Sequence, residues 1–533
     1  MEMKIRSYLL KLLISIFSIS YSQNNSSIYK NKSIIYFHSI NQELLDSLSK
    51  FSINSLGCRN SLLKSPIILD NQTISWLNKK NISFSILSND VEKEINKQMD
   101  RIQNIKASGS LNFFSTYRDL YEINDYLNSL IEKSNIVSKE VIGQSYEGRD
   151  LSVFKISVDT GVEDKPAIFI NGCQHAREWV TPMVAIYLIE NLLQDYLNIN
   201  EIKILLENVD VYILPVVNPD GYVYTWEKDR WWRKNRQINN ESDCVGIDLN
   251  RNWDFDWNGN ESTSENPCSY IYVGSGPFSA AETYFLSNYM SSIPNLVGHI
   301  DAHSYSSLIV GPWSSSNELT ADNEEIFCLG TSMQAAVSNT NDYPYIFGTG
   351  TVNNLLYLIS GGMVDWVYDD LSALSFLYEM RPASLYYFDP DFDGLSAFDN
   401  EEQEIIPTCM EFYQGVLEMI KWAYYGYCEV ATGCSDPLAL NYYCNTVEGE
   451  MGCLYNVDIY SPPQSNGAYN LSAYSLPLNF IDDGSCTYDT SIELLDNSKS
   501  IVKRLDIFGR QTDLNNFFIE LYSDGTFQKK YQF

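Results

Sequence analysis

The chain has 533 residues, of which 44% are hydrophobic, 14% aromatic and 20% charged. This composition excludes a wholly disordered or collagen-like protein and leaves room for roughly two to four domains. Lys and Arg total 36 against 68 Asp and Glu, and the net charge of −32 argues against nucleic acid or anionic membranes as partners. No apolar run reaches the roughly 18 residues that span a bilayer. The eleven cysteines indicate disulfides and a compartment outside the cytoplasm.

The N-terminus has the layout of a secretory signal peptide over residues 1–22. Lys4 and Arg6 precede a short apolar stretch that runs to Ile19, and the small residues Ser20 and Ser22 follow it. The alternative is a buried first helix, but no amphipathic period is visible. We therefore expect export, with cleavage after residue 22.

Residues 23–107 alternate short strands and helices, which predicts a small α+β domain. We expect strands at 34–37, 67–69 and 83–87, helices at 41–51 and 91–102, and a turn or short helix at 74–78. Arg101 and Lys106 lie in a polar stretch that suits proteolytic cleavage.

Residues 108–427 have buried strands that alternate with helices, which predicts an α/β sheet covered on both faces. Apolar residues keep helical spacing over 120–131 and 177–196. Strands are expected at 166–170, 209–217, 296–300 and 374–378.

Two further segments follow the α/β domain. Residues 428–490 contain Cys428, Cys434, Cys444, Cys453 and Cys486 with little apolar sequence between them, so we expect disulfides to hold a Cys-rich module together. Residues 491–533 predict strands at 500–508, 517–522 and 527–533, with an Asp-Gly turn at 524–525.

The sequence from Lys503 onward (KRLDIFGRQT) resembles the C-terminal sorting signal of the bacterial type IX secretion system. This resemblance implies that the secretion machinery recognises the tail and that the tail is removed on export. A small all-β module without an address role is the alternative.

Histidine is scarce, and the chain contains only His38, His175, His299 and His303. His175 and Glu178 lie where a buried strand ends and a helix begins, and their i,i+3 spacing places both on one face of the first helical turn. An imidazole and a carboxylate can both bind Zn²⁺. A catalytic zinc needs three protein ligands and an open position.

His303 is the candidate third ligand because it also ends an apolar strand. His299 enters that strand and is interpreted as a core or edge histidine. Glu379 ends the strand at 374–378. In open α/β sheets, sites gather beyond the carboxyl ends of strands, so we expect His175, His303 and Glu379 to meet there.

From about residue 116 to 423 the chain resembles the secreted zinc carboxypeptidases of the carboxypeptidase A/B type. The matching segments occur in the family's order: 145–149 (SYEGR), 175–179 (HAREW), 218–222 (NPDGY), 232–234 (WRK), 244–253 (CVGIDLNRNW), 303–306 (HSYS), 360–362 (SGG), 365–366 (DW) and 375–381 (SFLYEMR). The resemblance implies a mixed, mostly parallel twisted sheet flanked by helices. It also implies one Zn²⁺ per catalytic domain and the hydrolysis of C-terminal peptide bonds.

The resemblance also implies a role for each matching residue. His175, Glu178 and His303 would bind zinc, and Asp248 would orient His175. Glu379 would be the general base that activates water, and Arg233 would polarise the scissile carbonyl and stabilise the oxyanion. The α-carboxylate of the substrate would be held by Asn250 and Arg251, Tyr357 would close over it, and Arg177 and Tyr305 would line outer subsites.

The residues that match the side-chain pocket are apolar, which implies a preference for hydrophobic C-terminal residues. Val364 stands where the B-type enzymes carry an Asp, and Leu356, Ile359 and Leu377 fall at other pocket positions. Residues 23–107 lie where the family carries its inhibitory pro-domain, so the resemblance implies a zymogen.

Three cysteines agree with the family pattern or with a buried position, whereas the sequence after Arg381 departs from the family pattern. Cys244 and Cys268 match a disulfide pair, and Cys173 is expected to be a buried thiol. Pro382 replaces the Asp that usually follows the matching Arg. The acidic loop 389–394 is interpreted as a solvated loop, with a Ca²⁺ site as the alternative.

The predicted function is therefore a secreted zinc carboxypeptidase that is made as a zymogen and acts on peptide and protein C-termini. One alternative is a catalytically inactive carboxypeptidase-like surface binding protein. Another is the same enzyme with specificity for basic residues or for cell-wall peptides.

Overall fold

The fold is taken from a computed structural model, which describes residues 28–37, 67–109, 112–240, 242–260, 262–349, 358–382 and 402–426, and the backbone of short strands elsewhere. The chain has two compact units, Met1–Val430 with Ile459–Asn479, and Ala431–Asp458 with Phe480–Phe533. Several expectations fall outside the described residues: the signal peptide, the helix at 41–51, Leu356, Tyr357, the loop 389–394 and the cysteines of 428–490. No helix in the described part of the chain is long and apolar enough to cross a membrane.

A small four-stranded antiparallel sheet forms the first part of the chain, in the order β2-β3-β1-β4. Its elements are β1 Lys32–Phe37, β2 Asn54–Ser55, β3 Ile67–Asp70, α3 Asn71–Lys79, β4 Phe84–Ser88 and α4 Val91–Ala107. Asp70 and Asp90 cap the two helices by accepting hydrogen bonds from Thr73 N and Lys93 N. The segment 74–78, expected as a turn or short helix, is part of the nine-residue helix α3.

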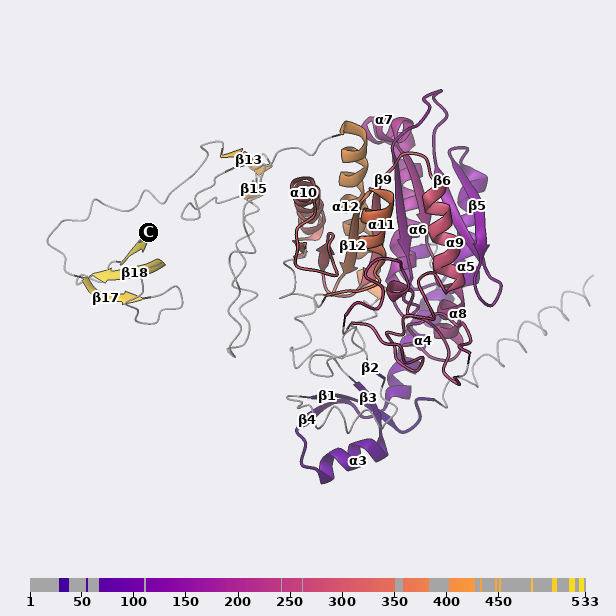
Figure 1. Cartoon of the computed structure of the whole chain (residues 1–533), viewed down its shortest axis with the longest axis vertical. Coiled ribbons are helices and arrows are strands. Elements are labelled where there is room, and N and C mark those ends of the chain that lie inside the picture. Colours follow the sequence, from indigo (N-terminus) through magenta and orange to yellow (C-terminus); the bar gives the residue numbers. More distant parts are fainter. Residues whose placement is uncertain are drawn as a thin grey trace, which may run out of the picture. The chain divides into compact units, whose positions relative to one another are not determined.

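The main sheet has eight strands in the order β11-β10-β12-β9-β7-β8-β6-β5 (Figure 1). They are β5 Val137–Gln144, β6 Asp150–Ile156, β7 Ala167–Gly172, β8 Asp210–Leu214, β9 Leu296–Ser304, β10 Leu308–Val310, β11 Ile346–Gly348 and β12 Leu374–Met380. The central strands β12, β9, β7 and β8 are parallel, and antiparallel pairs flank them on both sides. This mixed sheet is the expected fold class, although β8 ends at Leu214, before the expected end at 217.

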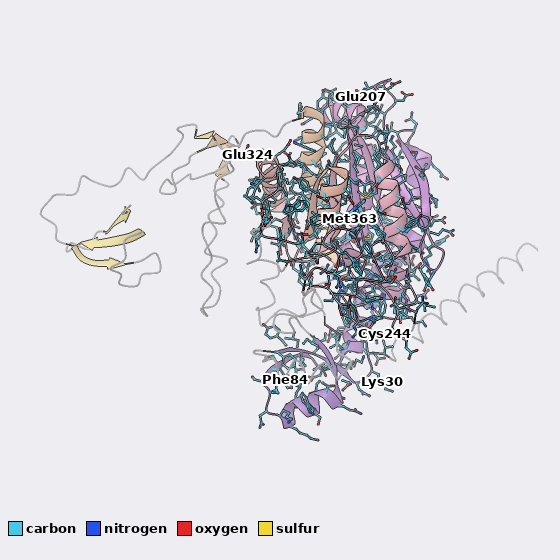
Figure 2. The ribbon with its side chains drawn as sticks, viewed as in Figure 1. Lys30, Phe84, Glu207, Cys244, Glu324 and Met363 are labelled. Atoms are coloured by element: carbon cyan, nitrogen blue, oxygen red, sulfur yellow. A yellow bond between two sulfur atoms is a disulfide. The ribbon has the colours of Figure 1, made fainter. Side chains whose placement is uncertain are left out.

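Helices cover both faces of the main sheet (Figure 1). One face packs against α5 Leu120–Lys133, α6 Val180–Asn198, α7 Asn200–Asn208, α10 Asn323–Asn341 and α12 Ile405–Tyr425. The other face packs against α9 Ala281–Ser292 and α11 Met363–Leu371, and Met363 lies inside the domain (Figure 2). Short helices complete the domain: η1 Phe113–Ser115, α8 Pro219–Glu227, η2 Leu249–Arg251 and η5 Glu402–Glu404.

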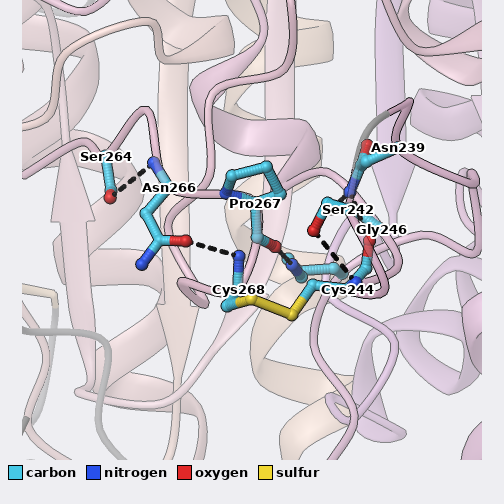
Figure 3. Close-up of a disulfide and its surroundings, with 9 residues drawn as sticks. Asn239, Ser242, Cys244, Gly246, Ser264, Asn266, Pro267 and Cys268 are labelled. Carbon is cyan, nitrogen blue, oxygen red and sulfur yellow. Dashed lines mark hydrogen bonds between the residues drawn. A yellow bond between two sulfur atoms is a disulfide. The ribbon is translucent and has the colours of Figure 1, made fainter. Parts of the chain in front are cut away.

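Cys244 and Cys268 form a disulfide, the pairing implied by the family resemblance (Figure 3). Local hydrogen bonds hold both ends, because Ser242 Oγ accepts from Cys244 N and Asn266 Oδ1 accepts from Cys268 N. Cys173 is a buried free thiol, as expected, and Cys409 is a second one.

The second unit contains short strands. β13 Thr432–Gly433 pairs with β16 Ile481–Asp482, and β14 Thr446–Val447 pairs with β15 Glu450–Met451. β17 Ile501–Leu505, β18 Phe517–Tyr522 and β19 Phe527–Tyr531 form an antiparallel sheet, which confirms three strands in the tail.

Candidate metal centre and active site

A tight turn between β7 and α6 brings His175 and Glu178 together. The expected first helical turn at this position is wrong, because α6 begins only at Val180. The chain leaves β7 through Cys173, whose φ is +61°, and Glu178 N then donates to His175 O at 3.2 Å. This turn replaces the helix and still places both side chains on one side of the chain.

Strand register places His303 and Glu379 next to each other. His303 is the eighth of the nine residues of β9, and its direct partner on the parallel strand β12 is Glu379. Residues that are directly opposite on neighbouring strands point to the same face of the sheet. Both side chains therefore lie on the same face of the sheet, near the carboxyl ends of β9 and β12. The neighbouring parallel strand β7 leads into the turn at 173–179 at this same end of the sheet.

The donor atoms of His175, Glu178 and His303 converge on one point. The two imidazoles face each other through Nδ1 at 3.0 Å, and the Glu178 carboxylate oxygens lie 2.8 Å from His175 Nδ1 and 3.1 Å from His303 Nδ1. All three residues are buried, and they are the group of the described residues that could hold a metal ion. Two histidines and a glutamate are a known ligand set of catalytic zinc.

The far side of each histidine ring lies beside a buried aspartate. Asp248 Oδ1 is 3.2 Å from His175 Nε2, and Asp301 Oδ2 is 2.8 Å from His303 Nε2. A ring that donates from Nε2 presents a lone pair at Nδ1, so two lone pairs and a carboxylate would face one another. Such lone pairs repel each other unless a cation lies between them. The donor set therefore fits a divalent metal ion.

Asp248 joins His175 to Arg233, since its second oxygen accepts from Arg233 Nε at 3.0 Å and Nη2 at 2.9 Å. Asp248 and Arg233 are both buried. Burial alone would raise the pKa of Asp248, but Arg233 and Arg251 lower it below its ordinary value. Asp248 therefore stays ionised at neutral pH.

The pKa values of the two glutamates of the site, Glu178 and Glu379, are shifted in opposite directions. Burial would raise the pKa of Glu178, but the facing imidazoles of His175 and His303 lower it. Burial, and then the nearby Glu178 carboxylate, raise the pKa of Glu379 to about 8. Glu379 Oε2 is buried and has no hydrogen-bond partner among the described residues. A divalent cation at the three donors would lower the pKa of Glu379.

Asn250 and Arg251 lie in the turn η2, and both are buried. Asn250 Oδ1 accepts from Met363 N at 2.9 Å, and its Nδ2 lies 3.2 Å from His303 Nε2. Arg251 donates from Nε to Ser262 O and from Nη1 to Asn250 O. Gly361 packs against Arg251 so closely that a Cβ would approach Arg251 O to 2.5 Å. Tyr357, expected over this position, lies outside the described residues.

An apolar cluster lies beside the site and contains Leu308, Val310, Val364 and Leu377, with Ile346 packed against it. Ile359 is also buried, and its N donates to Ser314 O at 2.8 Å. Ser314 N and Ser315 N in turn donate to Asp365, the neighbour of Val364.

Arg177 and Tyr305 flank the candidate metal ligands in sequence, and both are buried. Arg177 O accepts from Arg230 Nη1 at 3.0 Å. Tyr305 belongs to an apolar cluster with Trp231 and with four residues of the N-terminal part of the chain: Tyr29 before β1, Ile34 on β1, Ile68 on β3 and Val91 on α4. The N-terminal part of the chain and Tyr305, two positions from His303, therefore share one buried apolar cluster.

Pro382 leaves Arg381 without the acidic neighbour that the family pattern has, and α12 supplies the partner instead. Arg381 Nε donates to Glu411 Oε2 at 3.1 Å, and Tyr345 OH, which accepts from Arg381 N, donates to the same carboxylate. Glu404 forms a further ion pair with Arg381. These contacts anchor the chain directly after Glu379.

A cavity of about 430 Å³ lies away from these residues, where β8 begins. Lys155 and Lys165, which line it, both contact Asp210. The catalytic candidates lie at the opposite ends of the parallel strands, so this cavity does not belong to the site.

Sequence reasoning missed Asp301. The signal was present, because alternate residues of a strand share a face, and Asp301 lies two positions before His303 on β9. Gln174, which donates to Asp301 Oδ2 at 2.7 Å, was not predicted as a site residue either.

Residues 123–413 match the family model of the zinc carboxypeptidases. Carboxypeptidase A1 of Sus scrofa is 34% identical over 350 residues, which are 65% of this chain and 80% of that protein. Mast cell carboxypeptidase A of Rattus norvegicus is 33% identical over 356 residues, 66% of this chain and 82% of that protein.

Two solved structures have a similar fold. The crystal structure of thrombin activatable fibrinolysis inhibitor aligns with a TM-score of 0.64 and 30% identity, and covers 74% of this chain and 99% of that chain. Carboxypeptidase A from Helicoverpa armigera aligns with a TM-score of 0.61 and 24% identity, over 74% of this chain and 98% of that one, which supports the fold alone.

Proposed function

Since this chain belongs to the zinc carboxypeptidase family and is a metallocarboxypeptidase, a peptide hydrolase, we propose that it removes single residues from peptide and protein C-termini. The observation that carries the proposal is the convergence of His175, Glu178 and His303 beside Glu379. We further propose that the enzyme prefers hydrophobic C-terminal residues, is made as a zymogen and is secreted.

His175, Glu178 and His303 hold one Zn²⁺ in this proposal, with Asp248 orienting His175. Bound zinc would supply a Lewis acid that polarises a carbonyl and lowers the pKa of water. The buried position of all three residues keeps the site in a low dielectric, which strengthens each electrostatic interaction.

Glu379 is the proposed general base. Its Oε2 is buried without a partner among the described residues, so it can accept a proton from the attacking water. Arg233 is proposed to stabilise the charge that develops on the scissile carbonyl oxygen. Asp248 accepts a hydrogen bond from the Arg233 guanidinium and also contacts His175, so one aspartate positions both the guanidinium and the imidazole.

Recognition of a free C-terminus requires a cation for the α-carboxylate, and a guanidinium presents two parallel donors. We propose Arg251 and Asn250 for this role, with Tyr357 closing over them and Arg177 and Tyr305 lining outer subsites. The contacts of Arg251 to Ser262 O and Asn250 O support this role because they fix the guanidinium.

The apolar cluster around Val364 supports a hydrophobic preference. A buried ammonium or guanidinium of a substrate would lose several kcal/mol of hydration there without a partner. Peptides that end in Leu, Met, Ile, Val or Phe should therefore be better substrates than peptides that end in Lys or Arg. This argues against the basic-specific alternative.

Residues 23–107 are proposed as an inhibitory pro-domain, and their contacts support this role. Tyr29 donates to Asp229 and packs edge-on against Trp231. On α4, Gln98 Oε1 accepts from Arg230 Nε at 3.1 Å, and Arg101 pairs with Glu402. The likeness to the thrombin activatable fibrinolysis inhibitor structure covers 74% of this chain, more than the 123–413 segment.

Secretion is proposed from the two ends of the chain. Residues 1–22 would be a signal peptide, 428–490 a Cys-rich module and 491–533 a sorting signal for type IX secretion. The family membership and the presence of His175, Glu178, His303 and Glu379 favour an active enzyme over a binding protein without activity.

The test is digestion of a C-terminal peptide library with the protein after removal of residues 23–107, with and without a chelator. Stepwise loss of single C-terminal residues that stops with chelator and returns with zinc supports the proposal. Internal cleavage, or no cleavage at all, contradicts it.

A further inference from the structure

A row of buried polar side chains crosses three neighbouring strands of the main sheet and ends at His303. Its members are Ser375, His299, Asn171, Asp301 and His303. All five are fully buried, with no exposed surface. The row continues beyond the candidate metal site toward the centre of the sheet.

Strand register explains why these residues meet. Ser375 is the direct partner of His299 on β12 and β9, and Asn171 is the direct partner of Asp301 on β7 and β9. His299, Asp301 and His303 alternate along β9 and therefore share one face. The contacts are short: 2.7 Å from Ser375 Oγ to His299 Nδ1, and 2.8 Å from His299 Nε2 to Asn171 Oδ1.

The row has one consistent direction of donation. Asp301 is an acceptor, so the Asn171 group at 2.7 Å from Asp301 Oδ1 is the amide nitrogen, Nδ2. Asn171 Oδ1 then accepts from His299, which places the His299 hydrogen on Nε2. His299 Nδ1 in turn accepts from the Ser375 hydroxyl.

The same reasoning fixes the state of His303. Asp301 Oδ2 accepts from Gln174 Nε2 at 2.7 Å and lies 2.8 Å from His303 Nε2, so this ring nitrogen donates to it. The Asn250 Nδ2 contact to His303 Nε2 is longer, at 3.2 Å, and joins two donors. With its hydrogen on Nε2, His303 presents the Nδ1 lone pair to His175 and Glu178.

We propose that Asp301 is a positioning residue that fixes His303 as a metal ligand, and that Asn171 and His299 hold Asp301 in place. The proposal rests on the proposed zinc site. It gives His303 the kind of carboxylate partner that Asp248 provides to His175. Partners of this kind typically change metal affinity 10–100-fold when they are removed.

The direct test measures Zn²⁺ affinity by chelator competition for the full chain and for Asp301→Asn. An asparagine here must place its NH₂ group toward a donor, either Asn171 Nδ2 or the pair Gln174 and His303. We expect a loss of Zn²⁺ affinity of about 10–100-fold. Asp220→Asn is the matched control, because Asp220 is also a buried, hydrogen-bonded aspartate and is not in the row.

A double variant separates hydrogen bonding from simple damage to the core. Asp301→Asn combined with Asn171→Asp restores every donor–acceptor pair, since the amide at 301 can donate to the carboxylate at 171 and accept from His303. His299 Nε2–H then donates to that carboxylate. We expect the double variant to recover most of the lost Zn²⁺ affinity.

Each outcome decides between the interpretations. Loss in Asp301→Asn, recovery in the double variant and no change in Asp220→Asn support the proposal. Wild-type affinity in Asp301→Asn, or an equal loss in Asp220→Asn, overturns it while the zinc site stands. Absence of stoichiometric Zn²⁺ from the wild-type chain overturns the proposed function and this inference together.

Thermal melting of the metal-free proteins shows whether each variant folds. If Asp301→Asn does not fold, His299→Leu provides the second test, because it removes the donor to Asn171 at a distance from the metal ligands. It should reduce Zn²⁺ affinity in the same direction but by less. Unchanged affinity in a folded His299→Leu protein contradicts the role of the row.

Discussion

The ring of Tyr29 packs edge-on against the ring of Trp231, with the ring centroids 5.2 Å apart, although the two residues lie far apart in the sequence. Tyr29 also donates a hydrogen bond to Asp229. Burial, and then the charge of Asp229, raise the pKa of the Tyr29 hydroxyl well above its ordinary value, so this group remains a donor. This contact ties the N-terminal domain to the segment before Arg233.

The contact predicts that Tyr29→Ala weakens the inhibition of the uncleaved protein. Loss of a buried aromatic ring costs about 3–5 kcal/mol of packing, so the uncleaved variant should hydrolyse peptides faster than the uncleaved wild type. Tyr29→Phe, which removes only the hydrogen bond, should have a smaller effect. Tyr121→Ala is the control, because Tyr121 is 79% exposed. Equal latency in Tyr29→Ala and wild type would argue against this contact as a brake.

Activation by a trypsin-like protease should occur at Lys106 rather than at Arg101. Both residues lie in α4, so cleavage requires the helix to open locally. Lys106 is next to the end of α4, where helices fray, whereas Arg101 lies more than one turn inside. Lys106→Gln should therefore slow activation more than Arg101→Gln. Mass spectrometry of the new N-terminus checks this, and a terminus directly after residue 101 would contradict it.

Val364→Asp should shift the substrate preference toward C-terminal Lys and Arg. The new carboxylate would replace part of an apolar wall formed with Leu308, Val310 and Leu377, and it would offset the cost of burying a substrate cation. The measurement is kcat/KM on matched peptides that end in Leu, Phe, Arg and Glu. Val364→Leu is the control and should keep the hydrophobic preference. A wild-type preference for Arg would remove the pocket assignment but not the carboxypeptidase activity.

The contribution of Glu282 to stability should fall as the pH rises toward 7. Burial raises the pKa of Glu282 from 4.5 to about 7, so between these values the folded state binds more protons than the unfolded state. The stability contribution is therefore fully present below pH 4.5 and is lost as the pH rises through 7, by about 3 kcal/mol. Thermal melting of Glu282→Gln should show a flatter pH dependence. The exposed Glu163 supplies the control, Glu163→Gln, and an identical slope in Glu282→Gln and wild type would refute this assignment.

Much of the fold and the convergence at the strand ends could be predicted from the sequence because both depend on local patterns. Continuous apolar runs marked the strands that became β7, β9 and β12, and polar residues directly after or at the ends of these runs marked the site. The short strands β10 and β11 could not be found, because three residues are too few to show a period.

Features that depend on strand register or on contacts between distant segments could not be predicted from the sequence. The partnership of Asp301 with Asn171 depends on how β9 and β7 align, which no local pattern fixes. Beside the turn that replaced the expected helix start at 175–179, Gly172 lies so near the distant backbone of Thr181 that a Cβ would come within 3.0 Å of Thr181 O. The contact of Tyr29 with Trp231 joins segments that are 202 residues apart.

The most direct test of the zinc carboxypeptidase proposal compares Glu178→Ala with Glu379→Gln, using metal analysis together with the release of C-terminal residues. We predict that Glu178→Ala loses its zinc, because two ligands do not hold a catalytic zinc firmly. Glu379→Gln should retain one zinc per chain, bind substrate and lose several orders of magnitude in kcat. Stoichiometric zinc in Glu178→Ala, or a wild-type kcat in Glu379→Gln, would contradict the account.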